Sequence, residues 1–175
     1  LLVLSPGVDP LQLAIAHARR AGVPVIGEIE LASRWLRGRV IAITGTKGKS
    51  TTTTLIGRML VAGARVTTVG GNIGVPLSSQ VDASTPETLH VVEASSFQLE
   101  TTTTFRPWIA VWLNLAADHL DRHPTLEAYA AAKARIFTNQ TATDFAVVNA
   151  DDATVMAHTA HTRAALVPFS VRGGL

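Results

Sequence analysis

The stretch ITGTKGKSTTTT, residues 43–54, places two glycines, two lysines and a run of hydroxyl side chains between two apolar segments. The apolar segment before it, 40–43, is typical of a strand, and residues 49–62 are typical of a helix. Glycines allow backbone amides to converge on phosphate oxygens without a Cβ clash. The start of a helix adds unsatisfied N–H groups and the positive end of its dipole. The stretch therefore predicts a phosphate-binding loop.

This loop is shorter than a full Walker A motif, G-x-x-x-x-G-K-[ST], which would need glycine where the chain has Ile43. We expect Lys49 to reach the outer phosphates and Ser50 or Thr51 to bind Mg²⁺. The alternative is an ordinary strand–turn–helix connection with a surface lysine, but the order strand, loop, helix favours phosphate binding. The residues predicted to hold the phosphates are Gly45, Thr46, Lys47, Gly48, Lys49, Ser50 and Thr51.

Strands and helices alternate beyond the loop. Apolar strands are predicted at 40–43, 65–69, 89–93, 109–115 and 145–149, and helices at 49–62, 126–137 and 153–161. Before the loop, helices are predicted at 11–21 and 28–36 and a strand at 23–26. Short apolar strands separated by helices predict an α/β fold with a mostly parallel, doubly wound sheet. A turn at 37–39 suggests a boundary between an amino-terminal unit, 1–38, and a second unit, 39–175.

Composition excludes several classes of protein. Of the 175 residues, 47% are hydrophobic and 16% are charged, which fits a globular domain and argues against disorder. The formal net charge is only +2 and no dense Lys/Arg block is present, so nucleic-acid binding is not expected. The absence of cysteine excludes a disulfide framework and a thiolate metal site, and it fits a reducing compartment.

The sequence gives no sign of a membrane segment. No apolar run approaches the roughly 20 residues that span a bilayer. The first ten residues, LLVLSPGVDP, lack the basic region and cleavage site of a signal peptide. The chain begins with Leu and ends with RGGL without a closing element, so we expect it to be a fragment of a longer protein.

Polar side chains follow two of the predicted strands. Glu93 stands where the strand 89–93 ends, and Asn114, Asp118 and His119 lie at or just past the end of another. Ligands of doubly wound sheets bind at the carboxyl ends of the strands, where the phosphate loop also lies. A carboxylate and an imidazole beside a triphosphate would suit Mg²⁺. A helix-capping glutamate and a surface histidine are the alternatives.

Lys133 lies in YAAAKARIF, within a helix whose surroundings are mostly alanine. The residues alone favour a solvated lysine without a partner. An ammonium group would be a poor neighbour for Mg²⁺, so Lys133 could join a metal site only if its charge were reversed, for example by carbamylation.

Five stretches occur in the order and spacing of the Mur ligases: GTKGKSTTT, GGNIG, EASSFQLE, LNLAADHLDRH and YAAAKARIF. The chain resembles this family over nearly its whole length, and GGNIG together with SSFQLE resembles its D-glutamate-adding branch. The resemblance implies that residues 1–38 are the tail of a uridine-nucleotide-binding domain. It implies that residues 39–175 are an incomplete central ATPase domain, and that a carboxyl-terminal amino-acid-binding domain is absent.

The resemblance also implies roles for single residues. Lys49 and Ser50 would hold the ATP phosphates and Mg²⁺, of which two ions are expected. Glu93 and His119 would be magnesium ligands, and Lys133 would be a carbamylated lysine whose carbamate binds magnesium; Lys49, His119 and Lys133 would be the catalytic residues. The residues implied to contact the substrate are Asn72 and Ser95 near its muramoyl part, and Ser5, Pro6 and Gly7 at the rim of the uridine site.

The implied activity is ATP-dependent addition of D-glutamate to UDP-N-acetylmuramoyl-L-alanine through an acyl phosphate, in peptidoglycan precursor synthesis. A monomeric protein of the bacterial cytoplasm is implied, with small-molecule substrates and no nucleic acid. The fragment alone would be inactive, because the carboxyl-terminal domain supplies the D-glutamate site in this family.

Three other interpretations remain open from the sequence. The first is a sister ligase such as a folylpolyglutamate synthase, and the second is a P-loop nucleotide-binding module without ligase activity. The third is a structural domain with a fortuitous loop. Two features also depart from the family pattern: Lys47 stands where asparagine is commoner, and the stretch from His119 to Lys133 is about one residue shorter than in some relatives.

Overall fold

The computed structural model describes residues 1–5, 8, 12–118 and 122–173. Its main feature is a six-stranded sheet in which every neighbouring pair of strands is parallel. In spatial order the strands are β4 (Thr67–Gly71), β5 (Leu89–Glu93), β3 (Arg39–Thr44), β6 (Ile109–Trp112), β7 (Phe145–Asn149) and β8 (Ala165–Phe169). The predicted α/β fold with a mostly parallel sheet is confirmed. Since β3 lies between β5 and β6, their carboxyl ends meet next to the loop that follows β3.

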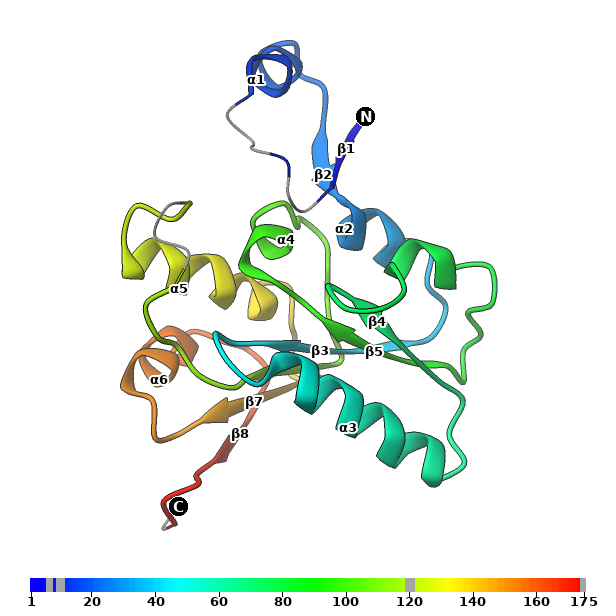
Figure 1. Ribbon diagram of the computed structural model, residues 1–175, viewed down its shortest axis with the longest axis vertical. Helices are drawn as coiled ribbons and strands as arrows, with labels where there is room; N and C mark the ends of the chain where they lie inside the picture. Colours follow the sequence, from blue (N-terminus) through cyan, green and yellow to red (C-terminus); the bar gives the residue numbers. More distant parts are fainter. Residues whose placement is uncertain (6–7, 9–11, 119–121, 174–175) are drawn as a thin grey trace.

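Helices cover both faces of this sheet (Figure 1). Helix α3 (Lys49–Ala62) lies on one face, where its Ile56 and Leu60 pack on a cluster that includes Ile41 and Ile43. The opposite face carries α2 (Glu28–Ser33), α4 (Ser96–Glu100), α5 (Leu126–Ala134) and α6 (Ala153–Thr159). Because both faces are buried, the central strands read as continuous apolar runs rather than as alternating patterns.

The amino-terminal part forms a separate two-stranded parallel sheet of β1 (Leu2–Leu4) and β2 (Val25–Gly27), joined by α1 (Leu13–Arg20). Helix α2 follows β2 directly and packs on the 3-10 turn η1 (Leu77–Gln80), which connects it to the second part of the chain. The two sheets are distinct, and the domain boundary after residue 38 stays a prediction.

The structure differs from the sequence prediction at several elements. Strand β8 and the short α4 and η1 were not predicted, and the helix predicted to reach 137 ends at Ala134 before the 3-10 turn η2 (Arg135–Phe137). Pro168 lies within β8 and argues against a strand, but a proline is tolerated on an edge strand such as this one. Strand β6 ends at Trp112 rather than at 115, because the following backbone turns toward the phosphate loop.

A buried carboxylate, which we call the Glu30 clamp, joins α2 to the segment between α4 and β6. The Glu30 side chain is fully buried and also pairs with Arg34. It accepts hydrogen bonds of 2.6–3.1 Å from the backbone N–H groups of Thr103, Thr104 and Phe105 and from the hydroxyl groups of Thr103 and Thr104. These donors outweigh the opposing effect of burial and lower the pKa of Glu30 to about 2.

Replacing Glu30 with glutamine should destabilise the fold in a pH-dependent way. The folded pKa lies below the ordinary value of 4.5, so the stabilisation is present above that value and is lost as the pH falls toward about 2. Glu30→Gln should lower the free energy of unfolding at pH 7 by about 3 kcal/mol through loss of the charge. Urea unfolding at pH 7 and pH 3 measures this difference.

The control is Glu87→Gln, because the side chain of Glu87 is exposed. It should unfold like the unmodified chain at both pH values. The gap between the unmodified chain and Glu30→Gln should shrink at pH 3, and an undiminished gap would contradict the role given to the charge.

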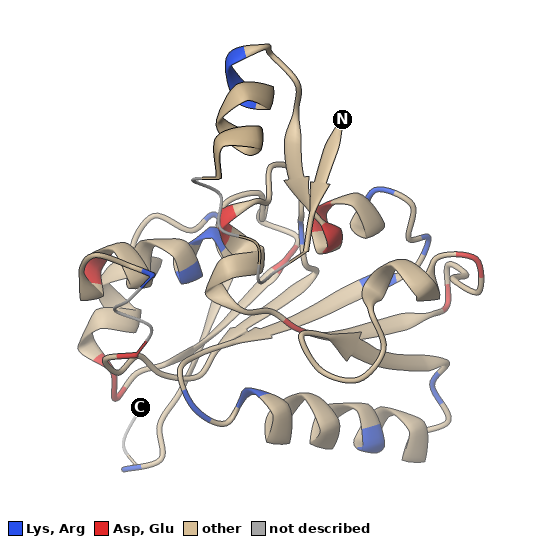
Figure 2. Ribbon diagram, turned by 45° about the horizontal axis from the view of Figure 1, so that its top comes forward, with Lys and Arg blue, Asp and Glu red and all other residues tan. Residues whose placement is uncertain are grey.

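Lys and Arg are spread over several elements rather than gathered on one face (Figure 2). Within the described residues, no helix is long and apolar enough to cross a membrane.

Candidate functional site

The loop after β3 has the backbone shape that its glycines predict. Gly45 has φ 151° and Gly48 has φ 81°, both in the region that favours glycine. Gly48 is also the N-cap residue of α3, and no side chain caps the helix there. The N–H groups of the first helical turn have no intrahelical acceptor. They therefore form a set of bare donors at the positive end of α3, as an oxyanion requires.

Two lysine side chains bind the carbonyl groups of this loop. Lys49 Nζ donates to the oxygen of Thr46 over 3.0 Å, and Lys133 Nζ donates to the oxygen of Gly45 over 2.8 Å. Lys49 comes from the start of α3, and Lys133 comes from α5 on the other face of the sheet. The loop therefore lies between two lysine side chains from elements far apart in the sequence.

Lys133 is not the solvated lysine that its alanine-rich surroundings suggest. Its side chain is 1% exposed, and its ammonium group lies 4.4 Å from the centre of the Tyr129 ring. Burial lowers the pKa of Lys133 to about 7, with a smaller contribution in the same direction from Lys49 and opposing contributions from Asp118 and Glu93. The prediction failed because neighbours along the helix do not reveal that the sheet covers this face.

Glu93 ends β5 beside the loop. It is 2% exposed, and its carboxylate accepts hydrogen bonds from Ser50 Oγ at 2.7 Å and from Asn72 Nδ2 at 2.8 Å. The structure thus brings together three residues that the sequence singled out, from α3, from the end of β4 and from β5. A hydroxyl and a carboxylate 2.7 Å apart are the hard oxygen ligands that Mg²⁺ prefers.

This donor set fits a magnesium ion that shares phosphate oxygens. Among the described residues, no group of three His, Cys, Asp or Glu side chains could hold a metal by itself. Magnesium usually keeps several waters and takes only one or two carboxylates when it binds with a nucleotide. One carboxylate and one hydroxyl therefore suffice on the protein side for one such ion.

The other predicted residues lie in different settings. Ser95 caps α4: its hydroxyl accepts from the N–H of Gln98 in a reciprocal capping box. Ser5 lines a small hollow with Phe97 and Arg122. Thr51 is exposed in the first turn of α3. The predictions for Pro6, Gly7 and His119 lie outside the described residues.

Asn114 has a contact with the loop that the sequence did not reveal. Its position after a strand was noted, but no role followed from it. Its Oδ1 accepts from the backbone N–H groups of Thr46 and Lys47, and its Nδ2 donates to the oxygen of Lys47. Only the placement of β6 beside β3 brings this carboxamide to the loop.

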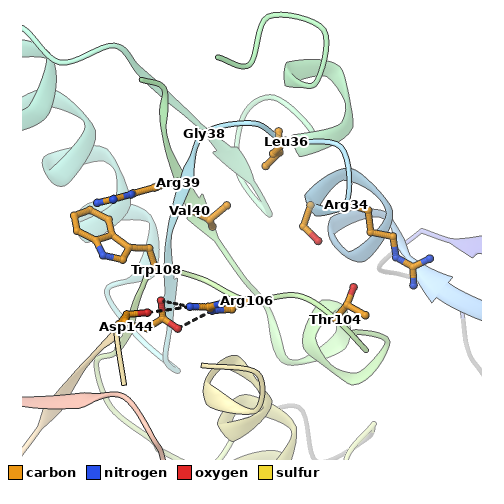
Figure 3. A pocket seen from close by; sticks show the side chains of 11 residues that line it. Arg34, Leu36, Gly38, Arg39, Val40, Thr104, Arg106, Trp108 and Asp144 are labelled. Carbon is orange, nitrogen blue, oxygen red and sulfur yellow. Dashed lines mark hydrogen bonds and ion pairs between the residues drawn. The ribbon is translucent and has the colours of Figure 1, made fainter. Parts of the chain in front are cut away.

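A cavity of about 520 Å³ lies at the opposite, amino-terminal ends of β3, β6 and β7 (Figure 3). Three of its residues are arginines. Arg106 pairs with Asp144, Arg39 stacks over Trp108 at 4.5 Å, and Arg34 belongs to the clamp on α2. All three cations are thus engaged by the protein, so the cavity has no feature that points to a ligand.

Comparison with known proteins places the chain in a family. The model of the Mur ligase middle domain matches residues 43–174. The chain is 56% identical over 152 residues to "UDP-N-acetylmuramoylalanine--D-glutamate ligase" of Koribacter versatilis, a match that covers 87% of this chain and 34% of that protein. A relative with the same name from Pelobacter propionicus is 51% identical over 170 residues, covering 97% of this chain and 38% of the relative.

The chain thus spans about a third of the length of these curated relatives. Their shared name agrees with the predicted resemblance to the D-glutamate-adding branch. That resemblance is confirmed.

Solved structures agree on the fold. A UDP-N-acetylmuramate:L-alanyl-gamma-D-glutamyl-meso-diaminopimelate ligase from Neisseria meningitides aligns with a TM-score of 0.67 at 19% identity, covering 95% of this chain and 57% of that one. MurF ligase from Thermotoga maritima, solved in complex with ADP, aligns with a TM-score of 0.63 at 23% identity, covering 91% and 44%. With its parallel sheet, its glycine loop and a family match over 43–174, the chain belongs to the Mur ligase family.

Proposed function

We propose that this chain is the nucleotide-binding part of a ligase that adds D-glutamate to UDP-N-acetylmuramoyl-L-alanine with ATP. The observation that carries the proposal is the hydrogen bond between Ser50 and Glu93 beside a loop held by Lys49 and Lys133. Relatives about half identical in sequence bear the name of this ligase, which favours it over a folylpolyglutamate synthase or a nucleotide switch.

The loop residues would bind the ATP phosphates. The substrate's L-alanyl carboxylate attacks the γ-phosphorus, ADP leaves, and the D-glutamate amine then displaces phosphate from the resulting acyl phosphate. The first step brings two anions together, so positive charge near the γ-phosphate lowers its barrier. Lys49, whose Nζ donates to the oxygen of Thr46, would give this charge by exchanging that oxygen for a phosphate oxygen. The amides of the first turn of α3 would hold the neighbouring phosphates.

Ser50 and Glu93 would hold magnesium, together with His119 as the resemblance implies. The metal would neutralise phosphate charge and orient the reacting oxygens. Asn72 donates a hydrogen bond to Glu93 and would keep that carboxylate oriented. Asn72 would also contact the muramoyl part of the substrate. The predicted contacts of Ser5, Pro6, Gly7 and Ser95 with the substrate remain part of this proposal.

Lys133 would act as a carbamate. A pKa of about 7 leaves a sizeable fraction of the amine neutral near pH 7, and the neutral amine is the form that adds to CO₂ with loss of a proton. The carbamate anion would then replace the ammonium group next to the metal. This change would remove the repulsion between Lys133 and Lys49, to which part of the lowered pKa is due.

The rest of the proposal concerns the whole protein: two magnesium ions, a monomer, and a place in the bacterial cytoplasm. An assay of phosphate release tests its central claim. The full-length protein should release phosphate from ATP only when D-glutamate and UDP-N-acetylmuramoyl-L-alanine are both present. Release that follows folate and L-glutamate instead would favour the sister ligase, and failure to bind Mg²⁺–ATP would favour a structural domain.

A further inference from the structure

We propose that Asn114 is a positioning residue that sets the shape of the phosphate-binding loop, an inference that rests on the function proposed above. Its Oδ1 accepts from the N–H groups of Thr46 at 3.1 Å and Lys47 at 2.9 Å. Its Nδ2 donates to the oxygen of Lys47 at 3.0 Å. Only this orientation of the carboxamide pairs its acceptor with two donors and its donor with a carbonyl. One side chain therefore satisfies three backbone groups of the loop.

A second connection fixes the same part of the loop. The hydroxyl of Thr46 donates to the oxygen of Ala116 at 3.2 Å and accepts from the N–H of Ala116 at 3.0 Å. The N–H of Thr46 also lies 3.1 Å from the backbone oxygen of Asn114. Residues 114–116 thus run beside the loop and bind it through both backbone and side chains.

The segment that holds the loop is itself anchored. Asn149 Nδ2 donates to the oxygen of Leu113 at 2.9 Å, and the N–H of Leu115 donates to Asp152 Oδ2 at 2.7 Å. Asn149 ends β7, and Asp152 caps α6. These contacts fix the backbone on both sides of Asn114, so its carboxamide is presented to the loop from a rigid support.

This arrangement divides the amides of the loop into two groups. Those of Thr46 and Lys47 are taken by Asn114, and those at the start of α3 are left for an oxyanion. Asn114 binds the backbone N–H and carbonyl groups of Lys47 and not its side chain, which is exposed. The departure from the commoner asparagine at Lys47 therefore leaves the loop's shape intact.

Hydrogen exchange tests the positioning role without relying on catalysis. In Asn114→Ala, the amide of Lys47 should exchange at least about tenfold faster, because it loses its side-chain acceptor. The amide of Thr46 should change less, because it keeps the backbone oxygen of residue 114 as an acceptor. The control is Asn139→Ala, since Asn139 also binds two backbone carbonyl groups, those of Thr103 and Phe105, but far from the loop. It should leave the exchange of both loop amides unchanged.

Nucleotide affinity gives the second measurement, made by calorimetry with Mg²⁺–ADP on the full-length protein. Asn114→Ala should raise the dissociation constant at least about tenfold, since the loop must be reordered on binding. Asn139→Ala should leave it within about twofold. Asn114→Asp keeps the acceptor and adds a negative charge, so it should retain slow exchange at both amides and still weaken binding.

The outcomes separate this inference from the proposed function. Fast exchange in Asn114→Ala, in a protein that binds no nucleotide even when unmodified, would uphold the role in shaping the loop and refute the function. Unchanged exchange and affinity in Asn114→Ala would overturn the inference, and so would equal effects from Asn139→Ala.

Discussion

Replacing Lys49 with alanine is expected to abolish ATP-dependent turnover in the full-length protein, lowering the rate by about 10³-fold or more. The side chain lies at the start of α3 and donates to the loop at Thr46. Of the two lysines in this stretch, Lys49 is the one whose ammonium group binds back onto the loop. Without it, the phosphates would meet the substrate carboxylate with less charge neutralised. Phosphate release from ATP, with both substrates at saturation, measures the effect.

The matched control is Arg58→Ala. Arg58 is an exposed cation on the same helix, and its removal changes the net charge by the same amount. Its turnover should stay within about twofold of the unmodified protein, because surface substitutions far from a site rarely matter. Near-normal acyl-phosphate formation by Lys49→Ala would refute the assignment of this lysine.

Lys133→Ala should cause a loss of similar size, about 10²-fold to 10³-fold, but one that added carboxylates can partly reverse. The variant removes a buried amine that binds Gly45 and leaves space where a carbamate would lie. Formate or acetate could enter this space and supply the missing anion. Turnover of Lys133→Ala should therefore rise with carboxylate concentration, by about tenfold or more, equivalent to about 1.4 kcal/mol of the barrier.

The same carboxylates should not restore Lys49→Ala, because that variant lacks a cation and not an anion. A flat response of Lys133→Ala to every carboxylate would contradict the carbamate role. Thermal unfolding of both variants without nucleotide checks that neither loss of activity comes from loss of the fold.

The Ser50–Glu93 contact shows which parts of the site could be predicted from the sequence and which could not. The loop, the helix that follows it and the strand that ends at Glu93 were predicted with bounds close to those observed. The order of the strands in the sheet could not be predicted in the same way. The apolar pattern places Glu93 at the carboxyl end of a strand, but it does not show that this strand lies beside β3. The 2.7 Å contact between Ser50 and Glu93 depends on that adjacency.

Lys133 and Asn114 were beyond the reach of local patterns. Each binds the loop across a long separation in the chain, from α5 to Gly45 and from the segment after β6 to Lys47. A lysine in an alanine-rich helix is expected to be exposed to solvent unless it is known which face of the helix the sheet covers. An asparagine after a strand has no preferred partner until the neighbouring strand is known.

The sequence by itself determined the parallel α/β fold and the glycine loop, because glycine spacing and apolar periodicity are local properties of the chain. It also indicated the family, through the resemblance of five short stretches to the Mur ligases. The tertiary structure alone decided that Lys133 is buried, that Asn114 holds the backbone of the loop, and that Glu30 fastens α2 to the segment before β6. These are hydrogen bonds between distant segments, and their partners are set by strand order and register, which no short stretch of sequence encodes.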